Sequence, residues 1–283
     1  MLVAPWQGRA SPLQMGLRAC APEQWLDEGD LFGRDDDFHI QIAEKNRLLD
    51  THLSAIYAAL PGSEPACLET CQLVAEAKEI DCPVRDASPE NQDMPLLAEI
   101  SRQIAEDLLL LAPADGSSSQ SEWTLQAACL AFPSHWRLAD KIGRPMAAIH
   151  APVPDYQARL DKPVNRFFSA MLPDTISVRY NWTLQIDSHL HAPMRIAAPL
   201  DNVAEVPTRL YVRVERQTFR KLPDTGWVVF GIRSYIAPLK LWADQPDALQ
   251  ELTRIVQNFS PAMRQYRDAG RYENWLQKWV DSL

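Results

Sequence analysis

The sequence predicts an α+β protein in which an antiparallel sheet carries helices over one face. Helical periodicity dominates the first third of the chain, and β-branched and aromatic runs fill much of the rest. Four or more strand-like segments in this order imply an antiparallel sheet. We expect one domain over residues 1–283, with an N-terminal helical extension over about 1–112 and C-terminal helices over about 243–283.

Three helices are predicted in the first third. Apolar residues at helical spacing run over 38–59, and Pro61 with Gly62 ends that pattern. A second helix is predicted over 64–80 and a third over 96–111, which Pro113 ends. A turn-rich linker and a polar loop follow the second and third helices, at 81–92 and 114–120 respectively.

The predicted strands begin after the polar loop. They cover 123–132, 175–186, 209–218 and 227–236. A short helix over 136–142, a turn at His150 and a helix over 156–171 lie between the first two strands, and the last of these is placed to cover a sheet face. Two helices close the chain, over 245–258 and 261–280, the second amphipathic.

Composition excludes several classes of protein. Hydrophobic residues make up 46% and charged residues 23%, which is typical of a compact globular chain. The net charge of −9 argues against nucleic-acid and anionic-membrane partners, which require clustered basic residues. The first residues lack the features of a secretory signal, and the longest apolar run, 108–112, is too short to span a bilayer. We therefore expect neither membrane insertion nor secretion.

Five cysteines without a CxxC spacing do not predict a disulfide framework, and they favour a reducing, cytoplasmic location. Cys67 and Cys71 share a helix face and Cys82 follows them. A metal clip is the alternative reading, although structural zinc prefers four ligands at tighter spacing.

His150 lies between a predicted helix and a proline turn. Pro152 and Pro154 fix their own φ angles and push the residues before them toward extended conformations, so the backbone after His150 should be stiff. A stiff backbone suits a metal or cofactor ligand. The alternative is that His150 caps or packs at a turn.

Three motifs surround this histidine. They are Phe132-Pro-Ser-His-Trp136, Lys141-Ile-Gly143 and Ile149-His-Ala-Pro-Val-Pro154. Further blocks agree in order and spacing: Trp25-Leu-Asp-Glu28, Asn46-Arg-Leu-Leu49, Arg179-Tyr-Asn-Trp182, Val214-Glu-Arg-Gln-Thr218, Leu222-Pro223 and Ile232-Arg-Ser-Tyr235. Together they resemble the signature of the haem-dependent oxidative N-demethylase α-subunit family. That resemblance implies a haem-binding relative of the PAS fold.

The resemblance also implies an activity. A haem b protein would use O2 to oxidise a small secondary amine such as dimethylamine, releasing formaldehyde. In the family, electrons come from NADPH through FMN and 2Fe-2S centres, and tetrahydrofolate can accept the one-carbon unit. This chain has no GxGxxG and no cysteine cluster, so those centres are expected on separate reductase subunits. The alternatives are a non-enzymatic haem-binding PAS-like gas or redox sensor and a structural protein without cofactor.

With the resemblance in view, each candidate site residue has a role and an alternative. His150 is the expected axial ligand of the haem iron, and His135 is a second candidate. Cationic partners for the haem propionates are sought among Lys141, Arg179, Arg216 and Arg233, any of which could instead be a surface charge. Asn181 could orient a ligand and Trp182 could pack on the macrocycle, although core packing is the simpler role for Trp182.

Glu215 is the candidate for binding the substrate amine, and its alternative is an ion pair with Arg213 or Arg216. His189 and His191 form a possible metal pair, for which a turn is the simpler reading. His39 and His52 are expected to be packed or solvated. We expect the haem pocket between the strand segments around Trp123, Val178, Val212 and Val229 and the helix over 156–171.

Overall fold

The computed structural model of the chain describes residues 4–7, 16–33, 37–83, 94–114 and 122–283. The strands are β1 (Arg18–Ala19), β2 (Tyr57–Ala59), β3 (Asp107–Pro113), β4 (Trp123–Cys129), β5 (Ile176–Gln185), β6 (Tyr211–Lys221) and β7 (Val228–Pro238). The α-helices are α1 (Asp37–Ile56), α2 (Glu64–Lys78), α3 (Leu96–Ser101), α4 (Met146–Ile149), α5 (Tyr156–Arg159), α6 (Asp161–Ala170), α7 (Val206–Arg209), α8 (Pro246–Gln257), α9 (Pro261–Arg267) and α10 (Glu273–Val280). Short 3₁₀ turns are η1 (Pro22–Gln24), η3 (Leu138–Asp140), η4 (Val203–Glu205), η5 (Leu239–Trp242) and η6 (Ala269–Arg271).

The described strands form one sheet in the order β1-β5-β6-β7-β3-β4-β2, and every neighbouring pair is antiparallel. β6 and β7 pair along their whole length, from Tyr211 opposite Pro238 to Lys221 opposite Val228. The predicted α+β class with an antiparallel sheet is confirmed.

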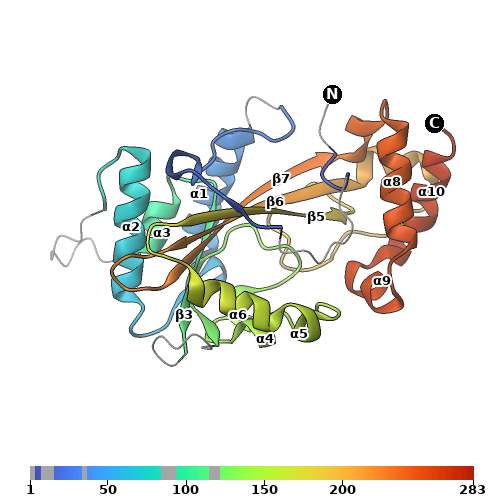
Figure 1. Ribbon diagram of the computed structural model, residues 1–283. Helices are drawn as coiled ribbons and strands as arrows, with labels where there is room; N and C mark the ends of the chain where they lie inside the picture. The colour runs from blue at the N-terminus through green and yellow to red at the C-terminus, as the bar shows by residue number, and fades with distance from the viewer. Residues whose placement is uncertain (1–3, 8–15, 34–36, 84–93, 115–121) are drawn as a thin grey trace.

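Helices pack on both faces of the central strands (Figure 1). Leu108 and Leu110 of β3 lie in a core with Leu48 of α1 and with residues of α2 and α3. The residues between and after them, Leu109 and Leu111, lie in a second core with Phe168 of α6 and with α4. We call these two surfaces of the sheet the α1 face and the α6 face. Because successive residues of a strand point to opposite sides, this assignment extends along the paired strands.

The prediction of a helix over 96–111 is half wrong. The helix is α3 and ends at Ser101, and the apolar run that follows is strand β3. β3 lies between β7 and β4 and is buried on both faces, so its sequence is continuously apolar and shows no alternation. A short run of this kind cannot be distinguished from a buried helix by periodicity alone.

Other predicted helices are shorter or broken. The helix over 38–59 gives way to β2 at Tyr57, and the helix over 156–171 is divided into α5 and α6 at Leu160, whose φ is −119°. The last helix is divided at Asp268, whose φ of 55° lies in the left-handed region. Within the predicted helix over 136–142 only the 3₁₀ turn η3 forms. The predicted linker from residue 84 and the polar loop from residue 115 fall outside the described residues.

The C-terminal helices α8, α9 and α10 lie together at one end of the sheet (Figure 1). Leu252 of α8 and Leu276 of α10 share a core with Trp182, Val214 and Tyr235 on β5, β6 and β7. Within the described part of the chain, no helix is both long and apolar enough to cross a membrane.

Close contact between β6 and β7 gives a stability prediction. A Cβ atom added to Gly231 would lie 2.6 Å from Thr218 Oγ1 on the paired strand, closer than packed atoms approach. We expect Gly231→Ala to lower the free energy of unfolding by about 1–3 kcal/mol, measured by chemical denaturation. Gly270→Ala, where nothing lies within 4 Å of the added atom, is the matched control and should be nearly neutral. An equally small effect at Gly231 would contradict the close packing of this strand pair.

Candidate functional site

The Phe132-Pro-Ser motif is held by buried polar groups. The carboxylate of Asp107 accepts hydrogen bonds from the backbone N–H groups of Ala131 (2.9 Å) and Phe132 (2.8 Å). Lys45 of α1 is fully buried and lies 3.3 Å from the same carboxylate, and the guanidinium of Arg213 donates to the Phe132 carbonyl. These contacts fix the start of the segment that leads toward His150. Asp107 and Lys45 were not predicted from the sequence.

His150 follows α4 directly. Its Nδ1 lies 3.0 Å from the carbonyl oxygen of Met146, one turn earlier in the chain. A carbonyl oxygen only accepts, so Nδ1 carries the proton and Nε2 keeps its lone pair. Burial lowers the pKa of His150 to about 4, so the ring is neutral near pH 7. A neutral imidazole whose other nitrogen bonds to a backbone carbonyl is the usual form of a histidine metal ligand.

Tyr156 stacks on this imidazole. The two ring centroids are 4.3 Å apart and the ring planes differ by 10°. Tyr156 is only 5% exposed, and among the described residues its hydroxyl has no hydrogen-bond partner. The stacking holds the imidazole ring in one orientation, and the phenol O–H remains as a buried donor beside it. Sequence reasoning missed Tyr156, although it directly follows the proline turn.

Two predicted cations lie near His150. Lys141 and Arg179 both lower the pKa of His150 through their charge, after the larger effect of burial. Lys141 lies over the ring of Trp136, 4.4 Å from its centroid, and burial lowers the pKa of Lys141 to about 8. Of the four cations predicted to meet the propionates, Lys141 and Arg179 are the two that lie near His150.

Glu215 lies on the α6 face of β6, two positions from Gln217 and four from Phe219. Its Oε2 accepts from Gln217 Nε2 at 2.9 Å and from Asn181 Nδ2 at 3.4 Å. Its Oε1 lies 3.8 Å from Nε of Arg213, which is an ion-pair distance but longer than a hydrogen bond. Lys141 is also close enough for the charge of Glu215 to oppose the fall in its pKa. The side chain of Glu215 is 15% exposed.

Three predicted site residues lie on the opposite, α1 face. Arg216 donates to the carbonyls of Gln24 and Trp25, and Arg233 donates to Gln41 of α1. Trp182 packs edge-on against Trp6, with centroids 6.0 Å apart, in the core formed with the C-terminal helices. The structure therefore brings His150, Lys141, Arg179, Asn181 and Glu215 to one face and does not bring Arg216, Arg233 or Trp182 to it.

Within the described ranges, the remaining histidines and the cysteines are not grouped as metal ligands. His191 Nδ1 lies 2.7 Å from the Ala131 carbonyl, while His189 is paired with Asp187 at 3.5 Å, so the two rings have separate partners. His39 and His52 are exposed. All five cysteines are free thiols, and the described residues contain no group of three or more side chains placed to hold a metal ion. The cysteine clip and the histidine pair are thus not supported.

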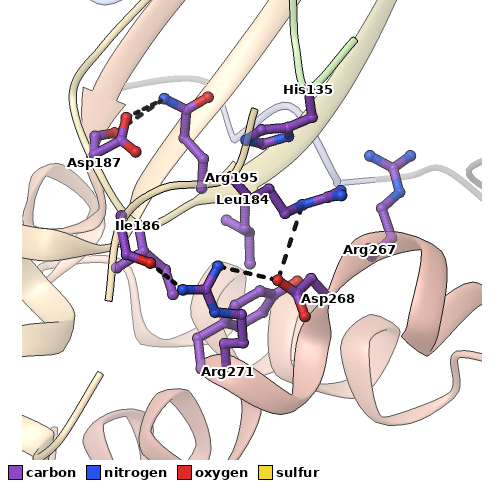
Figure 2. A pocket seen from close by; sticks show the side chains of 11 residues that line it. His135, Leu184, Ile186, Asp187, Arg195, Arg267, Asp268 and Arg271 are labelled. Carbon is purple, nitrogen blue, oxygen red and sulfur yellow. Dashed lines mark hydrogen bonds and ion pairs between the residues drawn. The ribbon is translucent and has the colours of Figure 1, made fainter. Parts of the chain in front are cut away.

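His135 lies elsewhere. It lines a partly open hollow at the end of β5, bordered by Arg195, Arg267 and Arg271 (Figure 2). Neither His150 nor Glu215 lines this hollow. We therefore treat it separately from the candidate site.

Comparison with known families matches residues 77–277 to the haem-dependent oxidative N-demethylase, alpha subunit-like family. The match covers more than half of the chain. This chain belongs to that family. All the candidate residues on the α6 face lie inside the matched range, and so do Asp107 and Tyr156, whereas Lys45 lies outside it.

The residues near His150 fit the haem that the family description names. The neutral imidazole offers Nε2 as a ligand, and Lys141 and Arg179 are cations of the kind that meet carboxylates. The Tyr156 hydroxyl is an orphan donor whose missing partner a bound group could supply. Donor types and charges therefore agree with the family description.

Proposed function

We propose that this chain is the haem-binding catalytic subunit of an oxidative N-demethylase that acts on a small secondary amine such as dimethylamine. The observation that carries the proposal is the arrangement of His150, whose Nδ1 bond to Met146 leaves Nε2 as the ligating atom. The family match supports the same cofactor and the same reaction class.

Bound haem b would supply an iron atom at which O2 is reduced while the N-methyl group is oxidised. In the overall reaction the secondary amine, O2, two electrons and two protons give the primary amine, formaldehyde and water. His150 would hold the iron through Nε2, with its ring fixed by the Met146 carbonyl and by the Tyr156 ring. Lys141 and Arg179 would pair with the propionates.

Glu215 would bind the amine. Its Oε2 already accepts from two side-chain amides, whereas within the described residues Oε1 has the 3.8 Å contact with Arg213 and no direct hydrogen bond, so Oε1 is the oxygen that would accept an N–H from substrate. A carboxylate favours the ammonium form, and the same group can take up the proton that must leave before the amine is oxidised. Asn181 and Gln217 fix the orientation of the carboxylate for both tasks.

Electrons must come from outside this chain. The description of the family as alpha subunit-like supports an assembly of several subunits. We propose that separate NADPH-linked reductase subunits carry FMN and a 2Fe-2S centre, and that tetrahydrofolate takes up the one-carbon product. The five free thiols suit a reducing, cytoplasmic compartment.

An absorption spectrum of the purified chain tests the proposal. We expect a haem band that shifts on reduction with dithionite and shifts again when dimethylamine is added, and formaldehyde release when an electron donor and O2 are supplied together. A colourless protein that does not take up added haem would overturn the proposal. A haem protein that responds to O2 but never to amines, and that releases no formaldehyde, would instead be a sensor.

A further inference from the structure

The hollow beside His135 carries more cationic than anionic side chains. Arg195, Arg267 and Arg271 line it, and the carboxylates among its described lining residues are Asp187 and Asp268. Since the chain as a whole has a net charge of −9, a locally positive hollow runs against the general charge of the protein. Such a local excess favours a negatively charged ligand.

Both carboxylates already have partners. Asp187 Oδ1 accepts from Gln185 Nε2 at 3.1 Å and from the His189 backbone N–H at 3.0 Å. Figure 2 shows Asp268 between two guanidinium groups: Arg271 Nη1 lies 3.1 Å and Arg195 Nε 4.0 Å from its Oδ2. Asp268 therefore neutralises Arg195 and Arg271 in part, whereas Asp187 is bonded to Gln185 and His189.

Within the described part of the chain, Arg267 forms no ion pair of this kind. Its Nη1 donates to the Trp182 carbonyl at 3.2 Å, and its Nε is buried without a hydrogen-bond partner within the described ranges. A buried N–H on a cation is costly unless something accepts from it. The missing partner is an acceptor, and the charge that complements it is negative.

His135, which lines the hollow, has an unusual backbone conformation. Its φ is +62°, a left-handed value that is uncommon for a residue other than glycine, and its N–H donates to the Ala192 carbonyl at 2.6 Å. Burial, together with the charge of Arg195, lowers the pKa of His135 to about 4. The imidazole is therefore a neutral group beside the arginines at pH 7, able to donate one hydrogen bond without adding charge.

We propose that this hollow binds a small oxyanion, a carboxylate or a phosphate, between Arg195 and Arg267. Arginine forks match the paired oxygens of both groups, and the arginines that line the hollow come from separate segments of the chain. The proposal does not depend on haem or on the amine reaction, because none of the residues assigned to them lines the hollow.

The proposal can be tested by measuring the pKa of His135 by NMR while inorganic phosphate or succinate is added to the whole chain. An anion beside the ring favours its protonated form, so each ligand that binds should raise the pKa of His135. His135→Asn identifies the signal, since asparagine tolerates a positive φ. Comparing the two ligands tells a phosphate site from a carboxylate site.

Two variants should change affinity in opposite directions. Arg267→Gln should weaken binding by about tenfold to a hundredfold, the worth of a charged hydrogen bond. Asp268→Asn should strengthen binding severalfold, because it removes a competing negative charge, and asparagine also accepts the left-handed φ of 55° at that position. Arg254→Gln on α8, whose side chain is 71% exposed, is the control for loss of an arginine charge.

The proposal is overturned if neither phosphate nor succinate, each at about 10 mM, shifts the pKa of His135. Binding that survives Arg267→Gln unchanged, or that Asp268→Asn weakens, also overturns it. Opposite effects of the two variants, with Arg254→Gln neutral, establish the site.

Discussion

His150→Ala is expected to yield folded protein that has lost its haem. The substitution removes both Nε2, the proposed ligand atom, and the ring that stacks on Tyr156, whereas the Asp107 and Arg213 contacts that hold the Phe132 motif are untouched. Haem content measured against protein concentration should fall to near zero, while circular dichroism stays close to that of the wild type. Without the proposed His150 ligand, the weaker contacts of the propionates and macrocycle would remain.

Two further variants make this result specific. His39→Ala changes an exposed histidine on α1 and should retain haem fully. His150→Gly leaves a space beside Tyr156 that added imidazole can fill, so imidazole should restore the haem band in this variant. Wild-type haem content and an unchanged spectrum in His150→Ala would show that His150 is a turn residue and that the ligand lies elsewhere.

The alternation of side chains along a strand predicts which candidate site residues share a face of the sheet. Arg179 and Asn181 are two positions apart on β5 and point the same way, as Arg213 and Glu215 do on β6. By the same rule Arg216 must point away from Glu215, and Trp182 away from Asn181. The residues predicted for the site come from both faces because residue type alone, without strand alternation, selects them.

Alternation along one strand does not by itself predict the sheet face on which Arg233 lies. Its face is set by the register of β7 on β6, which places it opposite Arg216, and register follows from the whole pairing of two strands. Asp107 was equally out of reach, because its strand read as a helix and its partner Lys45 is 62 positions away. The class of the fold and the His150 turn depended on local patterns, so they were accessible, whereas these long-range contacts were not.

Because successive strand residues point to opposite faces of the sheet, residues of the signature motifs contribute both to the fold and to the candidate site. Asp27, in the Trp25-Leu-Asp-Glu28 block, accepts a hydrogen bond from the Tyr235 hydroxyl, and the Trp25 carbonyl accepts a hydrogen bond from Arg216. These blocks therefore tie the N-terminal segment to the α1 face of the sheet. Glu215 shares its block with Arg216, and Asn181 shares its block with Trp182, but Glu215 and Asn181 lie on the α6 face. A single short motif therefore serves both stability and the candidate site.

Glu215→Gln is expected to lower turnover of dimethylamine by about tenfold to a thousandfold while haem content stays near the wild-type level. The amide keeps the size of the side chain but loses the negative charge that favours the ammonium form and the capacity to take up its proton. The measurement is formaldehyde release with a saturating electron donor, together with the amine-induced change in the haem spectrum. Glu99→Gln, which alters a carboxylate paired with Arg102 on α3, is the matched control and should have no effect on turnover.

The alternative role of Glu215 predicts a different pattern. Arg213 is fully buried, and burial lowers its pKa, so the carboxylate of Glu215 helps to keep that guanidinium charged. If this ion pair is the main role, Glu215→Gln should lower the melting temperature and haem retention, because it leaves a buried cation without its partner, while amine-induced spectral shifts in the remaining haem protein stay unchanged. The 3.8 Å separation between Arg213 Nε and Glu215 Oε1 argues for the first pattern, since a partner needed chiefly for stability would be expected to form a direct hydrogen bond.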